Sequence, residues 1–247
     1  AFEHGADVVE FDVRVTRDGR LALFHDYRLE YRTDGEGSVG DYTMEDLRLL
    51  DVGYGYTADG GRSFPLRGTG VGLMPSIDEL FREFPDRHFL IHIKDGGEEI
   101  GPILLSFLES LDDSTIRNIS AYGNDHALEL LNGRFPELRT MSRRSLLNAL
   151  RSYLLIGWSG YIPEPVRNTQ LHVPVDYAWM LWGWPDRFLE RMDRVDTAVY
   201  LVQYVGGWAG GFDSAADLER LPKGYTGGVW TNRIDIVGPL LKGVVAE

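Results

Sequence analysis

Alternation of apolar and polar residues along the chain predicts a series of short strands separated by helices. Residues 7–13 read Asp-Val-Val-Glu-Phe-Asp-Val, the pattern of a strand with two unlike faces. An Asp-Gly pair within residues 17–20 tolerates positive φ and predicts a hairpin turn into a strand over 21–24. Further strands are predicted over 89–94, 116–121, 138–142, 160–163, 197–204 and 227–230. Helices are predicted over 44–50, 77–84, 98–111, 125–131, 145–155, 184–192, 214–221 and 235–242, and a long glycine-rich loop over 52–70.

Strands and helices that alternate along a chain favour a parallel sheet with helices packed outside it. The chain has 247 residues, which is close to the roughly 250 residues of a single α/β barrel. We therefore expect one domain over residues 1–247. The pattern yields about seven strands of such a sheet, one fewer than a closed (β/α)₈ barrel contains.

The composition narrows the classes of partner. The formal net charge of −13 excludes a nucleic-acid backbone as the expected partner, because such binding needs a basic face. The chain has no cysteine, which excludes disulfides, cysteine-ligated zinc and thiol nucleophiles. No apolar run approaches the ~18 residues of a transmembrane segment. The sequence begins at Ala1 rather than at a methionine, so it leaves the compartment, cytoplasmic or exported, open. It also leaves the oligomeric state open.

Two carboxylates two residues apart form the first candidate site. Glu10 and Asp12 leave the same face of the first predicted strand, while Val9, Phe11 and Val13 face the outer helices. Side by side on an apolar strand, the carboxylates repel each other unless a cation lies between them. The pair therefore predicts either a site for Mg²⁺, Ca²⁺ or Mn²⁺, or a strand end at which both groups are solvated.

Two other strands carry groups that could act on a phosphate ester. His25 ends the strand after the hairpin, and a histidine there could be a general acid or base, although an isolated histidine is more often a surface residue. His92 and Lys94 repeat the two-residue spacing on one face of a later strand. An inward-facing lysine needs an anion, which either a phosphate oxygen or a salt bridge to Glu10 or Asp12 would supply.

Aromatic residues are unusually dense in the second half of the chain. Residues 177–184 read Tyr-Ala-Trp-Met-Leu-Trp-Gly-Trp, and Trp230 ends the last predicted strand. Such a group is typical of packing between layers, and it could also form an apolar lip for the alcohol or lipid portion of a substrate. Trp230 is accordingly a candidate substrate-binding residue.

Together these residues resemble the signature of the glycerophosphodiester phosphodiesterase family. The resemblance rests on the run over residues 5–13, on Thr16-Arg17-Asp18-Gly19 and on His25-Asp26. It continues through residues 74–80, 91–94, 119–122 and 227–233, and so covers nearly the whole chain.

The resemblance implies a TIM (β/α)₈ barrel and metal-dependent hydrolysis of a small-molecule glycerophosphodiester to glycerol 3-phosphate and an alcohol. Carried over by position, Glu10 and Asp12 would be metal ligands, with His92 at the third metal position. His25 would be a catalytic acid or base, and Lys94 would hold the phosphate. Because fold and metal site do not fix the alcohol, a lysophospholipid phosphodiesterase is an alternative.

Two departures from the family pattern bear on activity. The family opens with a strand carrying His-Arg and then a Pro-Glu-Asn-Thr motif, and neither is present, so we expect an N-terminally incomplete chain that lacks the first barrel strand. The family usually has a metal-binding glutamate at the position of His92, and imidazole suits Mn²⁺ better than Ca²⁺. Both departures leave open a catalytically impaired barrel that binds a phosphodiester or a protein without turnover.

Overall fold

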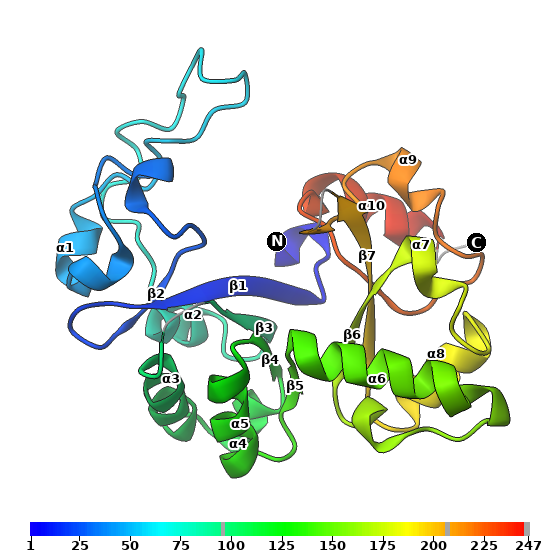
Figure 1. The fold of residues 1–247 in the computed structure, drawn as a ribbon. Coiled ribbons are helices and arrows are strands. Elements are labelled where there is room, and N and C mark those ends of the chain that lie inside the picture. Colours follow the sequence, from blue (N-terminus) through cyan, green and yellow to red (C-terminus); the bar gives the residue numbers. More distant parts are fainter. Residues whose placement is uncertain (95–96, 206–207, 245–247) are drawn as a thin grey trace. The chain divides into compact units, whose positions relative to one another are not determined.

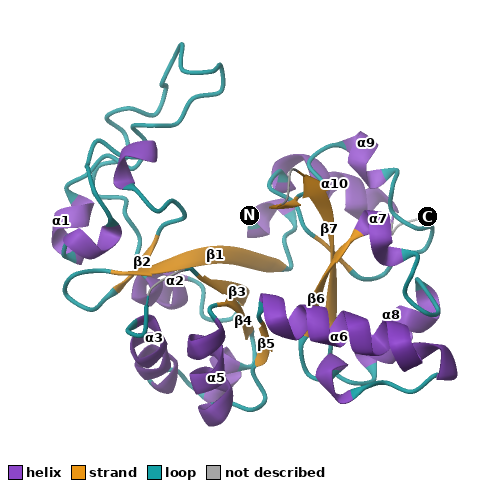
Figure 2. Cartoon of the chain, in the orientation of Figure 1, coloured by secondary structure: helices purple, strands orange, loops and turns teal. Residues whose placement is uncertain are grey.

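The computed structural model describes residues 1–94, 97–205 and 208–244 (Figures 1 and 2). Its contacts divide the chain into two compact units. The site unit is Glu10–Pro136, and the terminal unit joins Ala1–Val9 to Glu137–Glu247. The single domain expected over residues 1–247 stays a prediction. Within the described ranges, no helix is long and apolar enough to cross a membrane.

The sheet of the site unit runs in the order β2-β1-β3-β4. Its strands are β1 (Val8–Val15), β2 (Leu21–Leu23), β3 (His88–Ile93) and β4 (Ile119–Gly123). β2 returns antiparallel to β1 after the predicted turn, in which Gly19 has a φ of 72°, whereas β3 and β4 are parallel. The helices of this unit are η2 (Leu29–Tyr31), η3 (Val39–Asp41), α1 (Met44–Arg48), α2 (Ile77–Glu83), α3 (Ile100–Glu109), α4 (Asp113–Ile116) and α5 (Asp125–Arg134).

In the terminal unit, parallel strands carry helices on their apolar side. The strands are β5 (Arg139–Met141), β6 (Gln170–Pro174), β7 (Ala198–Val205), β8 (Trp208–Gly210) and β9 (Gly228–Val229). β7 pairs in parallel with β6 and β9, and antiparallel with β8. The helices are η1 (Phe2–His4), α6 (Arg143–Ile156), η4 (Gly157–Ser159), η5 (Glu164–Val166), α7 (Val175–Ala178), α8 (Asp186–Asp193), α9 (Ala215–Leu218) and α10 (Ile234–Val244).

The two faces of β1 differ as the alternation predicts. On one face, the ring of Phe11 lies 5.7 Å from that of Phe89 in β3 and 6.4 Å from that of Phe81 in α2. Phe81 in turn lies 5.4 Å from Phe107 in α3, so this face packs against the helices. Successive residues of a strand point to opposite faces, and Glu10 and Asp12 therefore leave β1 on the side away from α2.

The predicted long loop after residue 52 is held together by one buried carboxylate. Asp51 accepts hydrogen bonds from the backbone N–H groups of Gly53 (3.0 Å), Gly68 (2.6 Å) and Gly70 (2.9 Å). These bonds lower the pKa of Asp51, with the bond from Gly68 contributing most. At Gly70 a Cβ atom would lie 2.5 Å from the Asp51 carboxylate, so the close approach needs glycine.

One expected element is absent, and two others differ from their expected bounds. Residues 160–163 form no strand, because Gly160 has a φ of 87° and Pro163 opens η5; the strand of this region is β6. The sequence of β6 does not show the usual apolar alternation, because the polar residues Gln170 and His172 are buried on one of its faces. The strand predicted over 116–121 begins only at Ile119, since Asp112 caps α4 through the N–H groups of residues 114 and 115. The helix predicted over 214–221 is the shorter α9, and β8 was not predicted.

Candidate active site

The carboxylates of Glu10 and Asp12 meet side chains from the two neighbouring strands. His92, on β3, places Nδ1 2.7 Å from Asp12 Oδ1 and 3.6 Å from Glu10 Oε1. Tyr122, on β4, donates a hydrogen bond from its hydroxyl to Glu10 Oε1 at 2.8 Å. Side chains from three adjacent strands of one sheet thus lie within a few ångströms of one another.

Tyr122 is the residue of this group that sequence reasoning did not single out. Its ring is stacked on the imidazole of His92, with centroids 4.1 Å apart and planes at 10°. The parallel register that sets His92 opposite Tyr122 creates this stacking. A sequence gives no direct sign of strand register. The only signal for Tyr122 was that residues 119–122 belong to the stretches that resemble the family. The structure places Tyr122 to fix both the imidazole and the Glu10 carboxylate.

Lys94 follows β3 and turns toward the same carboxylate. Its Nζ lies 3.3 Å from Asp12 Oδ1 and donates a hydrogen bond of 3.4 Å to the backbone carbonyl of His25. The salt bridge to Asp12, one of the two partners expected for this lysine, is therefore present. The contact also ties the loop that carries His25 to the end of β3.

The pKa values of Glu10 and Asp12 are shifted in opposite directions. Burial, reinforced by the charge of Asp12, raises the pKa of Glu10 to about 7 against the lowering effect of the Tyr122 hydrogen bond. Burial also acts to raise the pKa of Asp12, but His92 and Lys94 outweigh it and hold that pKa below its usual range. Burial and the adjacent Glu10 raise the pKa of Tyr122, which keeps its hydroxyl a hydrogen-bond donor.

The donor set fits a divalent cation. Glu10, Asp12 and His92 each offer one ligand atom, and these atoms all lie within 4.8 Å of one another. Asp12 Oδ1 is buried and lies between His92 Nδ1 at 2.7 Å and Lys94 Nζ at 3.3 Å. Glu10 and Asp12 place two carboxylates side by side, and a cation between them relieves their repulsion. Two carboxylates and an imidazole are ligands that suit Mn²⁺ and related metals.

His25 lies in an exposed position beside a second acidic residue. Its Nδ1 is 3.0 Å from Asp26 Oδ1, and Asp26 Oδ2 accepts a hydrogen bond of 2.8 Å from Arg32. Burial acts to raise the pKa of Asp26, but His25 and Arg32 outweigh it and lower that pKa. The Arg14 guanidinium donates to the His25 carbonyl at 2.9 Å. The imidazole is thus oriented by a carboxylate that is itself held in place.

Trp230 belongs to the terminal unit, directly after β9. Its ring lies 5.3 Å from that of His172 on β6, and His172 lies 5.7 Å from Tyr200 on β7. These three side chains form an aromatic group on the parallel strands of this unit. The role of Trp230 in substrate binding stays a prediction.

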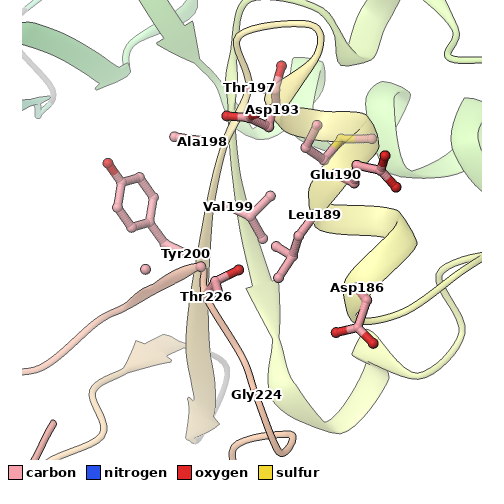
Figure 3. A pocket seen from close by; sticks show the side chains of 13 residues that line it. Asp186, Leu189, Glu190, Asp193, Thr197, Ala198, Val199, Tyr200, Gly224 and Thr226 are labelled. Carbon is pink, nitrogen blue, oxygen red and sulfur yellow. The ribbon is translucent and has the colours of Figure 1, made fainter. Parts of the chain in front are cut away.

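A cavity of about 530 Å³ lies elsewhere in the terminal unit, between α8 and the start of β7 (Figure 3). The charged residues that line it are Asp186, Glu190 and Asp193, which are spread along α8. Among the described residues of the lining there is no lysine, arginine or histidine. Carboxylates repel a phosphodiester at neutral pH. The cavity is therefore chemically unsuited to a phosphate ester.

Gly123→Ala is expected to weaken metal binding at Glu10, Asp12 and His92 by about tenfold, the usual scale for groups that support metal ligands. Gly123 has a φ of 121°, and a Cβ atom there would lie 2.2 Å from the Ile93 carbonyl oxygen and 3.2 Å from the His92 ring. Calorimetric titration with Mn²⁺ measures the change. Gly133→Ala, in α5 with nothing within 4 Å of the added atom, is the matched control. Equal affinities in the two variants would contradict this support role.

Comparison with known proteins places these observations in a family. A model of the Glycerophosphoryl diester phosphodiesterase family matches residues 1–126. A glycerophosphodiester phosphodiesterase of Caldanaerobacter subterraneus subsp. tengcongensis is 37% identical over 94 residues, which are 38% of this chain and 35% of that relative. The chain thus spans only about a third of the length of that curated relative.

Solved structures show the fold over nearly the whole chain. The glycerophosphoryl diester phosphodiesterase domain of a Mycobacterium tuberculosis protein has a TM-score of 0.71 at 15% identity, covering 97% of this chain and 90% of that one. An Oleispira antarctica phosphodiesterase, in complex with the product sn-glycerol-3-phosphate, has a TM-score of 0.61 at 15% identity, covering 99% and 87%. These likenesses confirm the expected fold class, the (β/α)₈ barrel.

Proposed function

Because the chain belongs to the glycerophosphoryl diester phosphodiesterase family, we propose that it hydrolyses glycerophosphodiesters to glycerol 3-phosphate and an alcohol with the help of a divalent metal. The observation that carries the proposal is the convergence of Glu10, Asp12 and His92, with Lys94 beside them. The sn-glycerol-3-phosphate bound to the Oleispira antarctica enzyme supports the proposed product.

Glu10, Asp12 and His92 would hold the metal, which when bound supplies Lewis-acid stabilisation of charge on a phosphoryl oxygen. Tyr122 positions two of these ligands, by its hydrogen bond to Glu10 and its stacking on His92. The low pKa of Asp12 keeps that carboxylate ionised and available at neutral pH. Mn²⁺ suits this donor set better than Ca²⁺, which prefers an all-oxygen shell.

Lys94 and His25 supply the remaining chemistry. The Lys94 ammonium, now 3.3 Å from Asp12, can turn to a phosphate oxygen, which it would bind as a point charge. His25 would transfer the proton at the attacking or leaving oxygen. Its Nδ1 lies against Asp26, so Nε2 is left to take or give that proton, and Asp26 stabilises the imidazolium when it forms.

Release of glycerol 3-phosphate from glycerophosphocholine by the full-length protein tests the proposal. We expect chelation to abolish turnover and Mn²⁺ to restore it. His25→Gln should lower kcat by about 10²–10⁴ without weakening Mn²⁺ binding, as expected when a general acid or base is lost. His126→Gln, on the exposed side of α5, is the matched control. Substrate binding without turnover under any metal would instead support the impaired barrel.

His92→Glu is expected to shift metal preference toward Ca²⁺ by about tenfold relative to Mn²⁺, because it replaces a neutral nitrogen ligand with a charged oxygen. Activity and calorimetric affinity with the two cations measure the shift. His88→Glu makes the same change at the exposed start of β3 and serves as control. An unchanged Ca²⁺/Mn²⁺ ratio would mean that His92 is not a ligand.

A further inference from the structure

The terminal unit exposes a group of large apolar side chains where α6 ends. Leu155 is 74% exposed, Trp158 68%, Trp179 73% and Trp182 46%. Of the aromatic segment over residues 177–184, only part packs inward. Trp184, for example, joins the core around Phe188, with ring centroids 5.7 Å apart. We call Leu155, Trp158, Trp179 and Trp182 the α6 patch.

The tryptophans of the α6 patch have their polar atoms satisfied inside the protein. The indole N–H groups donate to backbone carbonyls, that of Trp158 to Leu155 (3.1 Å), that of Trp182 to Leu154 (2.8 Å) and that of Trp179 to residue 176 (3.0 Å). What these rings offer to the solvent is therefore hydrocarbon. Exposed apolar surface that is concentrated in this way marks an interaction site.

The patch is also held rigidly. Arg191 donates hydrogen bonds from one nitrogen to the Tyr153 hydroxyl (2.8 Å) and the Gly157 carbonyl (2.9 Å). The Tyr153 hydroxyl donates to the Trp182 carbonyl at 2.8 Å, which joins α6 to the loop that carries Trp182. A Cβ atom at Gly157 would lie 2.9 Å from the Tyr153 ring, so the turn after α6 packs tightly. Rigid aromatic side chains lose little conformational entropy when they bind.

The sequence that forms α6 is basic, whereas the whole chain is acidic. Between Glu137 and Glu164 the sequence has no acidic residue, whereas the chain has a net charge of −13. Arg143, Arg144 and Arg151 are exposed on α6 within this stretch. At helical spacing, Arg144 and Arg151 share one face with Leu155. The stretch thus combines a locally positive helix with exposed apolar rings.

We propose that the α6 patch docks the protein on an anionic phospholipid surface. Tryptophan rings favour the interface between water and hydrocarbon, and each arginine near an anionic leaflet adds attraction that decays within a Debye length. The proposal does not depend on the phosphodiesterase activity.

Flotation of the full-length protein with vesicles tests the proposal. The vesicles are of phosphatidylcholine alone or of an equimolar mixture with phosphatidylglycerol. We expect binding to the mixed vesicles that weakens with added salt. Leu155→Ser and Arg151→Glu should each lower the partition coefficient by about tenfold, from lost apolar contact and lost charge attraction respectively.

Matched controls make the same changes in the site unit. Leu49→Ser, at a leucine that is 71% exposed, and Arg82→Glu, at an exposed arginine of α2, should alter partitioning by less than about twofold. Equal losses in the controls, equal binding to neutral vesicles, or no flotation would overturn the proposal. A dimer in sedimentation that Leu155→Ser abolishes, with no vesicle binding, would assign the patch to a second copy.

Discussion

Asp12→Asn is expected to lower kcat/KM for glycerophosphocholine by about 10³ or more, since metal-held charge stabilisation is worth several kcal/mol in a transition state. The asparagine keeps the size of the side chain but removes the charge. Asp12 is the carboxylate that lies closest to both His92 and Lys94, so the substitution would remove a proposed ligand and release the lysine from its ion pair.

Steady-state assays with Mn²⁺, together with a calorimetric Mn²⁺ titration, check this expectation. Asp86→Asn, at an exposed position after α2, makes the same substitution away from the site. A variant that keeps Mn²⁺ affinity and activity within about threefold of the unmodified protein would remove Asp12 from the proposed metal site.

Metal affinity is expected to fall about tenfold for each pH unit below 7, because the cation must displace the proton of Glu10. Burial and Asp12 raise the pKa of Glu10 from 4.5 to about 7, so below neutrality the metal-free site is protonated there. Asp12, whose pKa is lowered, remains ionised over this range and adds no such dependence.

The same shift affects folding stability with a definite sign. The folded chain binds the Glu10 proton more tightly than the unfolded chain, so the contribution of this group is fully present below pH 4.5 and is lost as pH rises toward 7. In metal-free protein, the free energy of unfolding should therefore decline with pH relative to Glu10→Gln, by up to about 1.4 kcal/mol per pH unit.

Mn²⁺ titrations and denaturant unfolding between pH 5 and 8 measure both effects. Glu10→Gln is the test variant in each, since a glutamine does not titrate. Glu83→Gln, on an exposed helical glutamate at the end of α2, is the control. A pH dependence that is unchanged in Glu10→Gln would assign the titration to another group.

The location of the candidate site followed largely from local sequence. The strand that carries Glu10 and Asp12, its hairpin turn at Gly19 and the strand that carries His92 were predicted within two residues of their observed bounds. Strand alternation fixes which side chains share a face. The two carboxylates and the His92–Lys94 pair could therefore be assigned to single faces before the strands were paired.

Other features depended on relations between distant residues. β6 was missed because Gln170 and His172 are buried and polar, so its burial does not show as apolar alternation. The aromatic segment could not be divided into core and surface, since Trp184 and Trp182 differ in the elements that cover them and not in residue type.

The sequence alone determined the family pattern, the strand faces and the residue types of a metal site, because these depend on neighbours along the chain. Only the tertiary structure decided that Asp12 is the shared partner of His92 and Lys94, and that Tyr122 supports the site through its stacking and hydrogen bond. Strand register and burial set these contacts, and with them the raised pKa of Glu10. Both arise from packing between segments far apart in sequence, where local pattern carries no information.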